Sequence, residues 1–399
     1  MKAETIFSQI RYEESRDDAP PGFPSLPEVP GGRYTDPAFF ALEVERVFRP
    51  AWHLAGHVAD LPEPRSYFIF DKLLGKPILV VRDREGEVRA FYNTCRHRGA
   101  PIVKDAAGRC NLLRCQYHSW AYDFDGRLLS VPDAHDFPGL DKADRGLIQL
   151  RCETFEGLIF VNEDPKAIPL VEWLGPLAEE WRTADLRALV PDYRWSRVIG
   201  CNWKCALDAF QEVYHIKTLH PTTVGAALDH HATAISLLPN GHSRMCVRYA
   251  HGDCETRPDG GWSDRSVYEQ TSVAHTMWPA LNVPWRIGSG KFMMFWPRGV
   301  DQCEVQIIGV GMPWGEGPLP AARQAGNDQF DSILMEDVEN LEAIQASLES
   351  GAFTGMILGY QERRLYWSHE QIDRAIGIDR LEKDLRVEQL LSPLVESPA

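Results

Sequence analysis

Two short segments of the chain bring cysteine and histidine together at a spacing suited to a metal centre. Cys95-Arg96-His97 is followed, after a spacer of seventeen residues, by Cys115-Gln116-Tyr117-His118. Two thiolates and two imidazoles are able to bind zinc, but zinc sites usually have roughly two to four residues between paired ligands. In one class of iron–sulfur centre, two histidines replace two cysteines on one iron of a [2Fe–2S] unit. Each segment supplies one cysteine and one histidine, so the pattern favours such a cluster.

A second group of candidate ligands lies in the run NWKCALDAFQEVYHIKTLHP. We expect a helix over residues 202–219, on which Asp208, Glu212 and His215 share one face because they are spaced i, i+4 and i+7. A straight helix would aim His220 elsewhere, but the proline after it disfavours helical geometry and lets His220 turn back. Two histidines and one carboxylate leave positions open on an octahedral Fe(II) for dioxygen beside a substrate. The alternative is an amphipathic helix whose polar face is only solvated.

The two runs resemble the Rieske non-haem iron oxygenases, and in particular the terminal oxygenase (alpha) subunit of the ring-hydroxylating family. Residues 93–126, with CRHRGAP and CQYHSWAYDFDG, are similar to the Rieske domain of that family. The second run resembles its catalytic-helix motif. The resemblance implies a [2Fe–2S] cluster whose ligands are Cys95, His97, Cys115 and His118.

The resemblance also implies roles for the residues of the second run. His215 and His220 match ligands of a mononuclear Fe(II), one per subunit. Glu212 matches the carboxylate that links the two metal centres, and Asp208 matches a polar position beside the pocket. Many ring dioxygenases carry Asp where this chain has Glu212, whereas several demethylating members of the family carry Glu.

The third iron ligand is expected to be a carboxylate far along the chain. The run LMEDVENLEAIQ offers several acidic residues, most of which belong to a solvated helix face. The family has an Asp, then two residues, then an Asn, and Asp337-Val338-Glu339-Asn340 matches that pattern. We therefore predict Asp337 as the ligand, with Glu336 as the second candidate.

The rest of the chain predicts the elements that position these residues. Thr35-Asp36-Pro37 has the capping side chain and early proline of a helix start, so we expect a helix to about Phe48. Short β-branched and aromatic runs such as SYFIF, KPILVVRD, VRAFYN and LIFVN predict strands, and KFMMFWPRG and EVQIIGVGMPW predict more strands later. Residues 164–169 indicate a linker. Further helices are expected at about 320–350 and 362–375, and an extended arm over residues 1–33.

The fold class implied by the resemblance is α+β. An N-terminal all-β Rieske [2Fe–2S] domain, at residues 51–165, would precede a helix-grip (START-like) catalytic domain at residues 166–399. In the catalytic domain an antiparallel sheet would wrap over a long helix. Residues 1–50 would form an arm and a helix that pack on the catalytic domain.

Composition limits the partners of the chain. The 42 basic and 57 acidic residues give a net charge of −15, which disfavours binding to nucleic acid or to anionic membranes. We find no apolar run long enough to span a bilayer and no signal peptide, so a cytoplasmic protein is expected. Nine cysteines spread over the chain do not indicate a disulfide framework.

The implied activity is that of the terminal component of a multicomponent oxygenase. It would use O2 and electrons from NAD(P)H, delivered by a flavin reductase directly or through a ferredoxin, to hydroxylate a hydrophobic or aromatic small molecule. Oxidative N- or O-demethylation of a quaternary ammonium or methoxy compound is the alternative, which Glu212 favours slightly. A homotrimer (α3) is expected, or α3β3, in which the cluster of one subunit faces the iron of the next.

Two other classes of protein are less compatible with these residues. A Rieske electron-transfer protein would need no second metal site, and a hydrophobic-ligand carrier of the helix-grip type would need no cluster. Four other histidines, His230, His231, His242 and His251, are interpreted as surface or pocket-wall residues, and Cys110 as packed near the cluster. The aromatic residues and methionines of 271–297 are expected mostly to pack, with alternate members lining a pocket.

Overall fold

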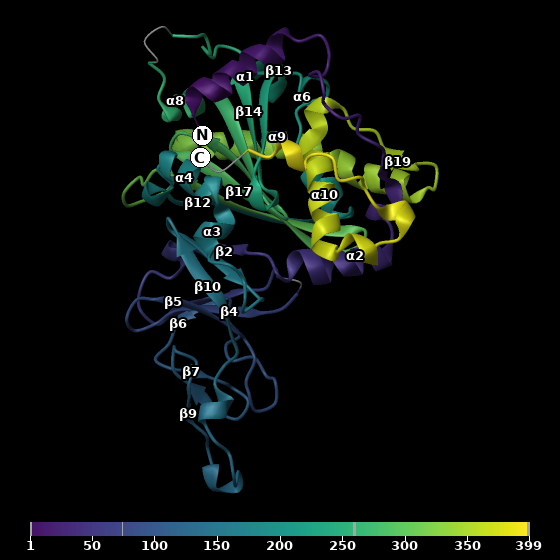
Figure 1. Ribbon diagram of the computed structural model, residues 1–399. Helices are drawn as coiled ribbons and strands as arrows, with labels where there is room; N and C mark the ends of the chain where they lie inside the picture. The colour runs from purple at the N-terminus through teal and green to yellow at the C-terminus, as the bar shows by residue number, and fades with distance from the viewer. Residues whose placement is uncertain (1, 74, 258–260, 397–399) are drawn as a thin grey trace. The chain divides into compact units, whose positions relative to one another are not determined.

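A computed structural model describes residues 2–73, 75–257 and 261–396. The described chain forms two compact units (Figure 1). The smaller is Arg49–Glu172, and the larger combines the residues before and after it. The division expected from the sequence placed the limits of this unit at 51 and 165, whereas residues 49–50 and 166–172 also belong to it in the structure. No helix of the described residues is long and apolar enough to cross a membrane.

The smaller unit is built from short strands, as its β-branched and aromatic runs predict. An antiparallel seven-stranded sheet has the order β2-β11-β10-β5-β4-β3-β6, and a three-stranded sheet has the order β7-β8-β9. The strands are β2 (His53–His57), β3 (Ser66–Phe70), β4 (Ile78–Arg82), β5 (Val88–Tyr92), β6 (Ala107–Arg109), β7 (Leu113–Arg114), β8 (Ala121–Tyr122), β9 (Leu128–Ser130), β10 (Gln149–Phe155) and β11 (Leu158–Asn162).

The larger unit is centred on an antiparallel seven-stranded sheet of order β12-β18-β17-β16-β15-β14-β13. These strands are β12 (Val190–Ile199), β13 (Leu228–Leu237), β14 (Ser243–Tyr249), β15 (Thr271–Met277), β16 (Leu281–Arg286), β17 (Ser289–Gly299) and β18 (Gln302–Gly311). A two-residue pair, β1 (Val29–Pro30) with β19 (Gly355–Met356), ties the N-terminal segment to the C-terminal part. The mixed helix and strand content confirms the α+β class.

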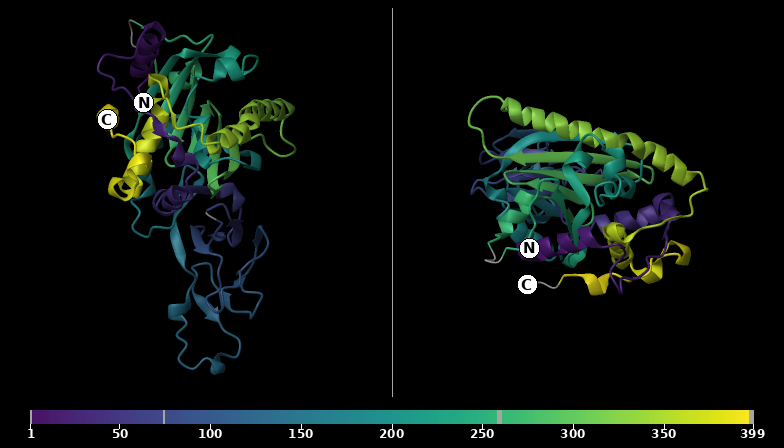
Figure 2. Two further views of the ribbon diagram at one scale, coloured as in Figure 1. Left: turned by 90° about the vertical axis from the view of Figure 1, so that its right-hand side faces the viewer. Right: turned by 90° about the horizontal axis from the view of Figure 1, so that it is seen from above.

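The α-helices lie mainly in the larger unit. They are α1 (Ala3–Ser15), α2 (Pro37–Glu43), α3 (Leu170–Leu174), α4 (Pro176–Thr183), α5 (Trp203–Asp208), α6 (Ile216–Leu219), α7 (Val224–Ala227), α8 (Asp264–Gln270), α9 (Ala321–Glu349) and α10 (Arg363–Ile376). The long helix α9 runs along the sheet (Figure 2). Short α5 and α6 carry the second candidate run, so the elements that position it are α5, α6 and α9.

The N-terminal segment differs from its prediction as an extended arm. Residues 3–15 form α1, which buries Ile6, Phe7 and Ile10 at helical spacing and packs along β13. These apolar residues repeat with the period of a helix, whereas proline and glycine are concentrated after residue 18. The predicted start of the next helix is confirmed, because the Asp36 side chain accepts hydrogen bonds from the backbone N–H groups of Ala38 and Phe39.

The predicted continuous helix over residues 202–219 is wrong. Helix α5 ends at Asp208, and the chain turns before α6 begins at Ile216. In between, the Glu212 carboxylate accepts hydrogen bonds from the backbone N–H groups of Tyr214 and His215, in place of the carbonyl oxygens one helical turn earlier. Because the Glu212 side chain accepts these hydrogen bonds, the two N–H groups do not form helical hydrogen bonds. Glu212 and His215 therefore lie on a loop.

Candidate metal centres

The Cys95 and Cys115 loops of the smaller unit close in the same way. Cys95 donates its backbone N–H to the carbonyl of Ala100, and Gly99 donates to the carbonyl of Cys95. In the second loop Cys115 donates to Trp120 and Ser119 donates to Cys115, at equivalent positions. The fourth residue after each cysteine has a positive φ, 77° at Gly99 and 58° at Ser119. Two loops of matching geometry each present one cysteine and one histidine.

The cysteines lie inside the unit and the histidines nearer its surface. Cys95 and Cys115 are buried, whereas His97 and His118 are half-buried with ring centroids 4.7 Å apart. Trp120 stacks on the His97 ring at 4.8 Å and fixes its plane. A two-iron cluster of this kind takes its cysteines on one iron and its histidines on the other. The arrangement fits a two-iron cluster better than a single metal.

An orphaned nitrogen supports the same interpretation. His97 Nδ1 is buried, and it has no hydrogen-bond partner among the residues that the structure describes. Burial lowers the pKa of His97, and the neighbouring His118 and Arg98 lower it further, which keeps the imidazole neutral. A neutral imidazole nitrogen without a protein partner is the form that binds a metal. The residues present therefore fit a [2Fe–2S] cluster held by Cys95, His97, Cys115 and His118.

The second candidate set is brought together by α6 and α9 in the larger unit. One ligand atom from each of His215, His220 and Asp337 lies within 4.8 Å of the other two. Asp337 Oδ1 is 3.1 Å from His220 Nε2 and 3.5 Å from His215 Nε2. His215 immediately precedes α6 and His220 follows it, so the single turn of helix places both rings toward α9. His220 leaves the helix at the residue before the proline, as predicted.

The outward nitrogen of each histidine meets a second carboxylate. His215 Nδ1 is hydrogen-bonded to Glu212, and His220 Nδ1 to Glu336, which also accepts a hydrogen bond of 3.1 Å from the Thr223 hydroxyl. Such carboxylates fix the tautomer and leave Nε2 for a metal. Glu336, the second candidate for the third ligand, thus lies on the far side of His220 from Asp337. Thr223 was not singled out from the sequence, and no spacing rule would have found it.

The carboxylates around His220 create a negative charge that suits a bound cation. Burial alone would lower the pKa of His220, but its hydrogen bonds with Asp337 and Glu336 raise it. Two carboxylates on one imidazole thus stabilise a positive charge between them, which a divalent metal supplies better than a proton. Two histidines and one carboxylate are the donors that non-haem Fe(II) sites use. The residues present therefore fit a mononuclear iron.

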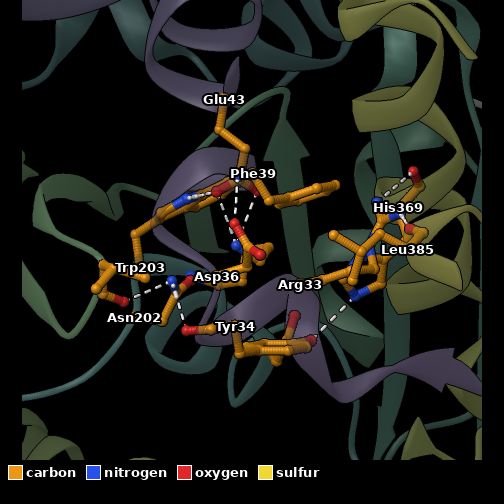
Figure 3. A network of polar contacts seen from close by, with 12 residues as sticks. Arg33, Tyr34, Asp36, Phe39, Glu43, Asn202, Trp203, His369 and Leu385 are labelled. Atoms are coloured by element: carbon orange, nitrogen blue, oxygen red, sulfur yellow. Dashed lines mark hydrogen bonds and ion pairs between the residues drawn. The ribbon is translucent and has the colours of Figure 1, made fainter. Parts of the chain in front are cut away.

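Asp208 is held by a directional chain of buried hydrogen bonds. Figure 3 shows Arg33, Tyr34 and His369 of this chain. Arg33 Nε donates to His369 Nδ1 at 3.1 Å, so the proton of this neutral ring is on Nε2, which donates to the Tyr34 hydroxyl at 3.0 Å. The Tyr34 hydroxyl then donates to Asp208 Oδ2 at 2.6 Å. Asp373 pairs with the Arg33 guanidinium at 2.6 Å. The chain ends on a guanidinium that does not release protons, so it orients Asp208 rather than conducting protons to it.

Burial raises the pKa of Asp208 to about 7, against the opposing effect of Tyr34 and Lys204. The folded protein then binds more protons than the unfolded chain between about pH 4 and pH 7, so this residue lowers stability as the pH rises. We expect Asp208→Asn, which keeps an acceptor for Tyr34, to gain stability relative to the wild type as the pH increases through that window. Urea unfolding of both proteins at pH 5 and pH 7.5 measures this, and an unchanged difference would show that Asp208 ionises normally.

A cavity of about 820 Å³ adjoins the second site. Its wall includes Glu212, His215, His220 and Asp337, and it extends between the sheet and α9. Of the aromatic and methionine residues singled out in 271–297, Trp285 and Met293 line it, while Trp278, Phe292, Phe295 and Trp296 pack elsewhere. The expectation that most of them pack and a few line a pocket is confirmed.

The structure places the four histidines that were interpreted as surface or pocket-wall residues, and also Cys110. His242 was expected at the surface or on a pocket wall, and this is wrong: it is fully buried, donates to the Trp173 carbonyl and accepts from the Trp278 N–H. Burial lowers its pKa to about 4, so it is neutral. His231 and His251 are exposed, and His230 is half-buried. Cys110 packs against the core that contains Cys95 and Cys115, as predicted.

One further acidic group lies in the smaller unit. Single oxygens of Asp83, Glu85 and Asp125 come within 4.8 Å of one another. Arg89 lies between two of them, with Nε 2.9 Å from Asp83 and 3.4 Å from Asp125. The guanidinium supplies the positive charge that the group needs.

Two family descriptions match the chain, each over one of the two sites. The Rieske [2Fe-2S] domain matches residues 51–144, and the ring hydroxylating alpha subunit (catalytic domain) matches residues 186–378. The first match contains the four cluster candidates, and the second contains both histidines and Asp337 of the iron site.

Relatives of known activity cover different lengths of the chain. Biphenyl 2,3-dioxygenase subunit alpha of Rhodococcus jostii (strain RHA1) is 40% identical over 193 residues, which are 46% of this chain and 41% of that protein. The alignment thus spans less than half of that relative. The carnitine monooxygenase oxygenase subunit of Acinetobacter baumannii is 30% identical over 330 residues, which are 81% of this chain and 85% of that protein.

The fold is that of solved Rieske oxygenases. A quaternary ammonium Rieske monooxygenase superposes with a TM-score of 0.75 at 21% identity, over 90% of this chain and 99% of that one. At this identity the likeness concerns the fold alone, whereas the family descriptions and the long alignment concern the sequence. The chain therefore belongs to the Rieske-type ring-hydroxylating oxygenases, as an alpha subunit with a Rieske domain and a catalytic domain.

Proposed function

We propose that this chain is the terminal oxygenase of a multicomponent system that hydroxylates an apolar small molecule held in the cavity beside His215, His220 and Asp337. The observation that carries the proposal is the convergence of these three side chains on the wall of a cavity of about 820 Å³. The same chain carries a second donor set, on paired loops, that fits an electron-carrying cluster.

The two metal groups would be held by separate residues. Cys95, Cys115, His97 and His118 would bind a [2Fe–2S] cluster, and His215, His220 and Asp337 would bind Fe(II). When bound, the cluster supplies electrons one at a time and the Fe(II) supplies the activation of dioxygen. Glu212 and Glu336 hold the outward nitrogens of the two histidines and so keep both rings aimed at Asp337.

Glu212 has a further role in this proposal. Its carboxylate holds the loop that carries His215, through the N–H groups of Tyr214 and His215, and it holds the His215 ring as well. Tyr214 beside it is 70% exposed, so this loop lies at the surface of the unit. A carboxylate at that place is able to accept a hydrogen bond from a histidine of another subunit, and we propose that it links the two metal centres across a subunit boundary.

Oxidative demethylation remains the second candidate activity. It is favoured by Glu212 in place of Asp and by the long alignment with a carnitine monooxygenase subunit. The cavity wall favours hydroxylation instead, because it includes the cations Lys291, Arg286 and Arg323 and few aromatic faces to surround an ammonium group. Turnover of apolar candidates under isotopically labelled dioxygen, with product analysis, distinguishes the two: label retained in an alcohol or diol supports hydroxylation, and loss of methyl as formaldehyde supports demethylation.

We propose that the partners are a flavin reductase, with or without a ferredoxin, and two further copies of this chain arranged head to tail, with α3β3 as the alternative assembly. We also propose a cytoplasmic location, which the nine free cysteines and electron delivery from NAD(P)H support. The net charge of −15 suits electrostatic selection of a partner with a basic docking face.

Mixed trimers test the transfer between subunits. Cys115→Ser chains would lack the cluster and Asp337→Ala chains would lack the iron, so each variant alone is expected to be inactive. Unfolding a 1:1 mixture and reassembling it, with metals restored, should return about a quarter of wild-type activity. In a head-to-tail ring about half of the chains would hold iron and about half of their neighbours would hold a cluster, so about a quarter of the positions would have both. Transfer within one chain predicts that the mixture stays inactive. Wild type carried through the same treatment is the control for recovery.

A further inference from the structure

The cavity has a second polar region, away from the candidate iron ligands. Lys291 on β17, Asp192 on β12, and Arg323 and Asn327 on α9 all line it. Lys291 Nζ donates to Asn327 Oδ1 at 2.6 Å, and it lies 3.8 Å from Asp192 Oδ1. Arg323 Nη1 lies 3.6 Å from the other oxygen of Asp192.

Glycines on the strand between β12 and β17 make room for this group. Gly309 of β18 is paired with Tyr193 on one side and Lys291 on the other. A Cβ at Gly309 would lie 2.5 Å from Lys291 Nζ, and a Cβ at Gly311 would lie 2.4 Å from Asp192 Oδ2. Both contacts are far too close for real atoms, so the two glycines allow Lys291 and Asp192 to lie across β18. The region is therefore a built part of the cavity wall.

Lys291 and Arg323 donate fewer hydrogen bonds to the described residues than their side chains are able to donate. Within the described part of the chain, the Lys291 ammonium has one hydrogen-bond acceptor, Asn327, although it carries three donors. Arg323 gives one side-chain hydrogen bond, to the Met312 carbonyl, out of five donors. Asn327 and the side chain of Asp192 are buried, and Asp192 Oδ1 has no hydrogen-bond partner among the described residues.

The net charge of this region is positive. Lys291 and Arg323 contribute two cations to this part of the cavity wall, and Asp192 contributes one carboxylate. Arg323 also lies in the first turn of α9, whose N-terminal end carries a partial positive charge. Burial lowers the pKa of Lys291, and Asp192 and Asp331 offset the effect only in part. A ligand anion would supply the missing compensation.

Helix α9 sets the distance between this region and the candidate iron site. Asn327 and Asp337 are ten residues apart on one helix, which is about 15 Å along its axis. Phe330 and Ile333 lie between them on the cavity side, with Trp285 and Met293 opposite on the sheet. The cavity thus has a metal end, an apolar middle and a basic end.

We propose that the basic end binds the carboxylate of an elongated substrate, whose apolar body fills the middle of the cavity and brings a carbon–hydrogen bond to the iron site. Lys291 and Arg323 are the specificity-determining residues in this proposal, and Asn327 and Asp192 orient them. The inference rests on the proposed function for its chemistry, but it concerns binding and is tested without turnover.

Isothermal titration calorimetry on the metal-loaded oxygenase, without an electron donor, measures the preference directly. Stilbene-4-carboxylate is the probe, because its length suits the apolar middle and one end carries the anion. Stilbene-4-carboxamide is the matched neutral probe. We expect the carboxylate to bind about tenfold more tightly than the amide, since charge-assisted hydrogen bonds are the stronger ones.

Variants assign the preference to residues. Lys291→Met and Arg323→Met should each reduce the carboxylate-to-amide ratio about fivefold or more, while leaving the affinity for the amide unchanged. Lys383→Met, which makes the same change at an exposed position, should keep the full ratio. Arg323 is more exposed than Lys291, so its variant decides the result if Lys291→Met fails to fold.

Equal binding of both probes, no binding of either, or a ratio that survives in Arg323→Met would overturn the proposal. Iron content and oxygenase turnover, measured separately, show whether the proposed function itself has failed.

Discussion

Replacing Asp337 with alanine is expected to remove the mononuclear iron and leave the cluster intact. Asp337 Oδ1 is the carboxylate oxygen that lies near Nε2 of both His215 and His220, and the residue is buried. Without it the two imidazoles supply two neutral donors to a divalent cation, which is too few to hold iron in competition with water. Turnover should fall by well over 100-fold, since even outer residues of metal sites alter affinity by about 10–100-fold.

Metal analysis and the visible spectrum of the purified variant measure both parts of this prediction. The visible spectrum reports the cluster and should match that of the wild type. Glu339→Ala is the matched control, because it removes an exposed carboxylate from the same helix and should retain the iron. Normal iron content in Asp337→Ala, together with iron loss in Glu336→Ala, would transfer the ligand role to Glu336.

Replacing Glu212 with alanine is expected to separate the two centres functionally while both metals remain bound. Glu212 hydrogen-bonds His215 on the nitrogen that faces away from Asp337, so its loss removes the proposed link but no iron ligand. We expect turnover to fall about 100-fold with an unchanged cluster spectrum and iron content. Stopped-flow reduction should show normal reduction of the cluster followed by slow reoxidation in the presence of substrate and O2.

Two further variants distinguish the proposed role of Glu212 between the metal centres from its role in holding the loop. Glu212→Gln keeps the length of the side chain and one acceptor for the N–H groups of Tyr214 and His215, but it cannot also accept a hydrogen bond from His215. It should resemble the alanine variant in turnover and the wild type in stability. Glu362→Gln, a change in a half-buried carboxyl group nearby, should leave turnover unaltered. Wild-type turnover in Glu212→Ala would contradict the linking role.

The sequence predicted elements whose signals are local. Asp36 before Pro37 indicated a helix start that the structure confirms, and alternating β-branched runs indicated strands that form the sheet of the smaller unit. The candidate ligands were also found from short spacings, and the structure brings His215, His220 and Asp337 together. For Asp337, more than a hundred residues away, a resemblance to a family motif was required.

Two predictions, the helix over residues 202–219 and the location of His242, were wrong because side-chain contacts determine the structure there. The apolar spacing over residues 202–219 suited one helix, but Glu212 satisfies the N–H groups of Tyr214 and His215 and ends the helical pattern before α6. His242 was interpreted as a surface or wall residue because nothing in the sequence shows that Trp173 and Trp278 enclose it.

Other features depend on pairing that a single sequence does not reveal. The chain from Arg33 through His369 and Tyr34 to Asp208 joins segments more than 150 residues apart. The basic end of the cavity depends on the register that places Gly309 beside Lys291. Register is set by tertiary packing of whole strands, so no local signal marks either group.

We propose that one chain carries two distinct metal centres. Iron and acid-labile sulfide content of the purified protein, with the EPR spectrum of its reduced form, tests this most directly. We expect about three irons and two sulfides per chain, with the low average g-value of a cluster that has two histidine ligands. About two irons and two sulfides, with no third iron taken up on reconstitution, would contradict it, because His215, His220 and Asp337 would then not form a metal site.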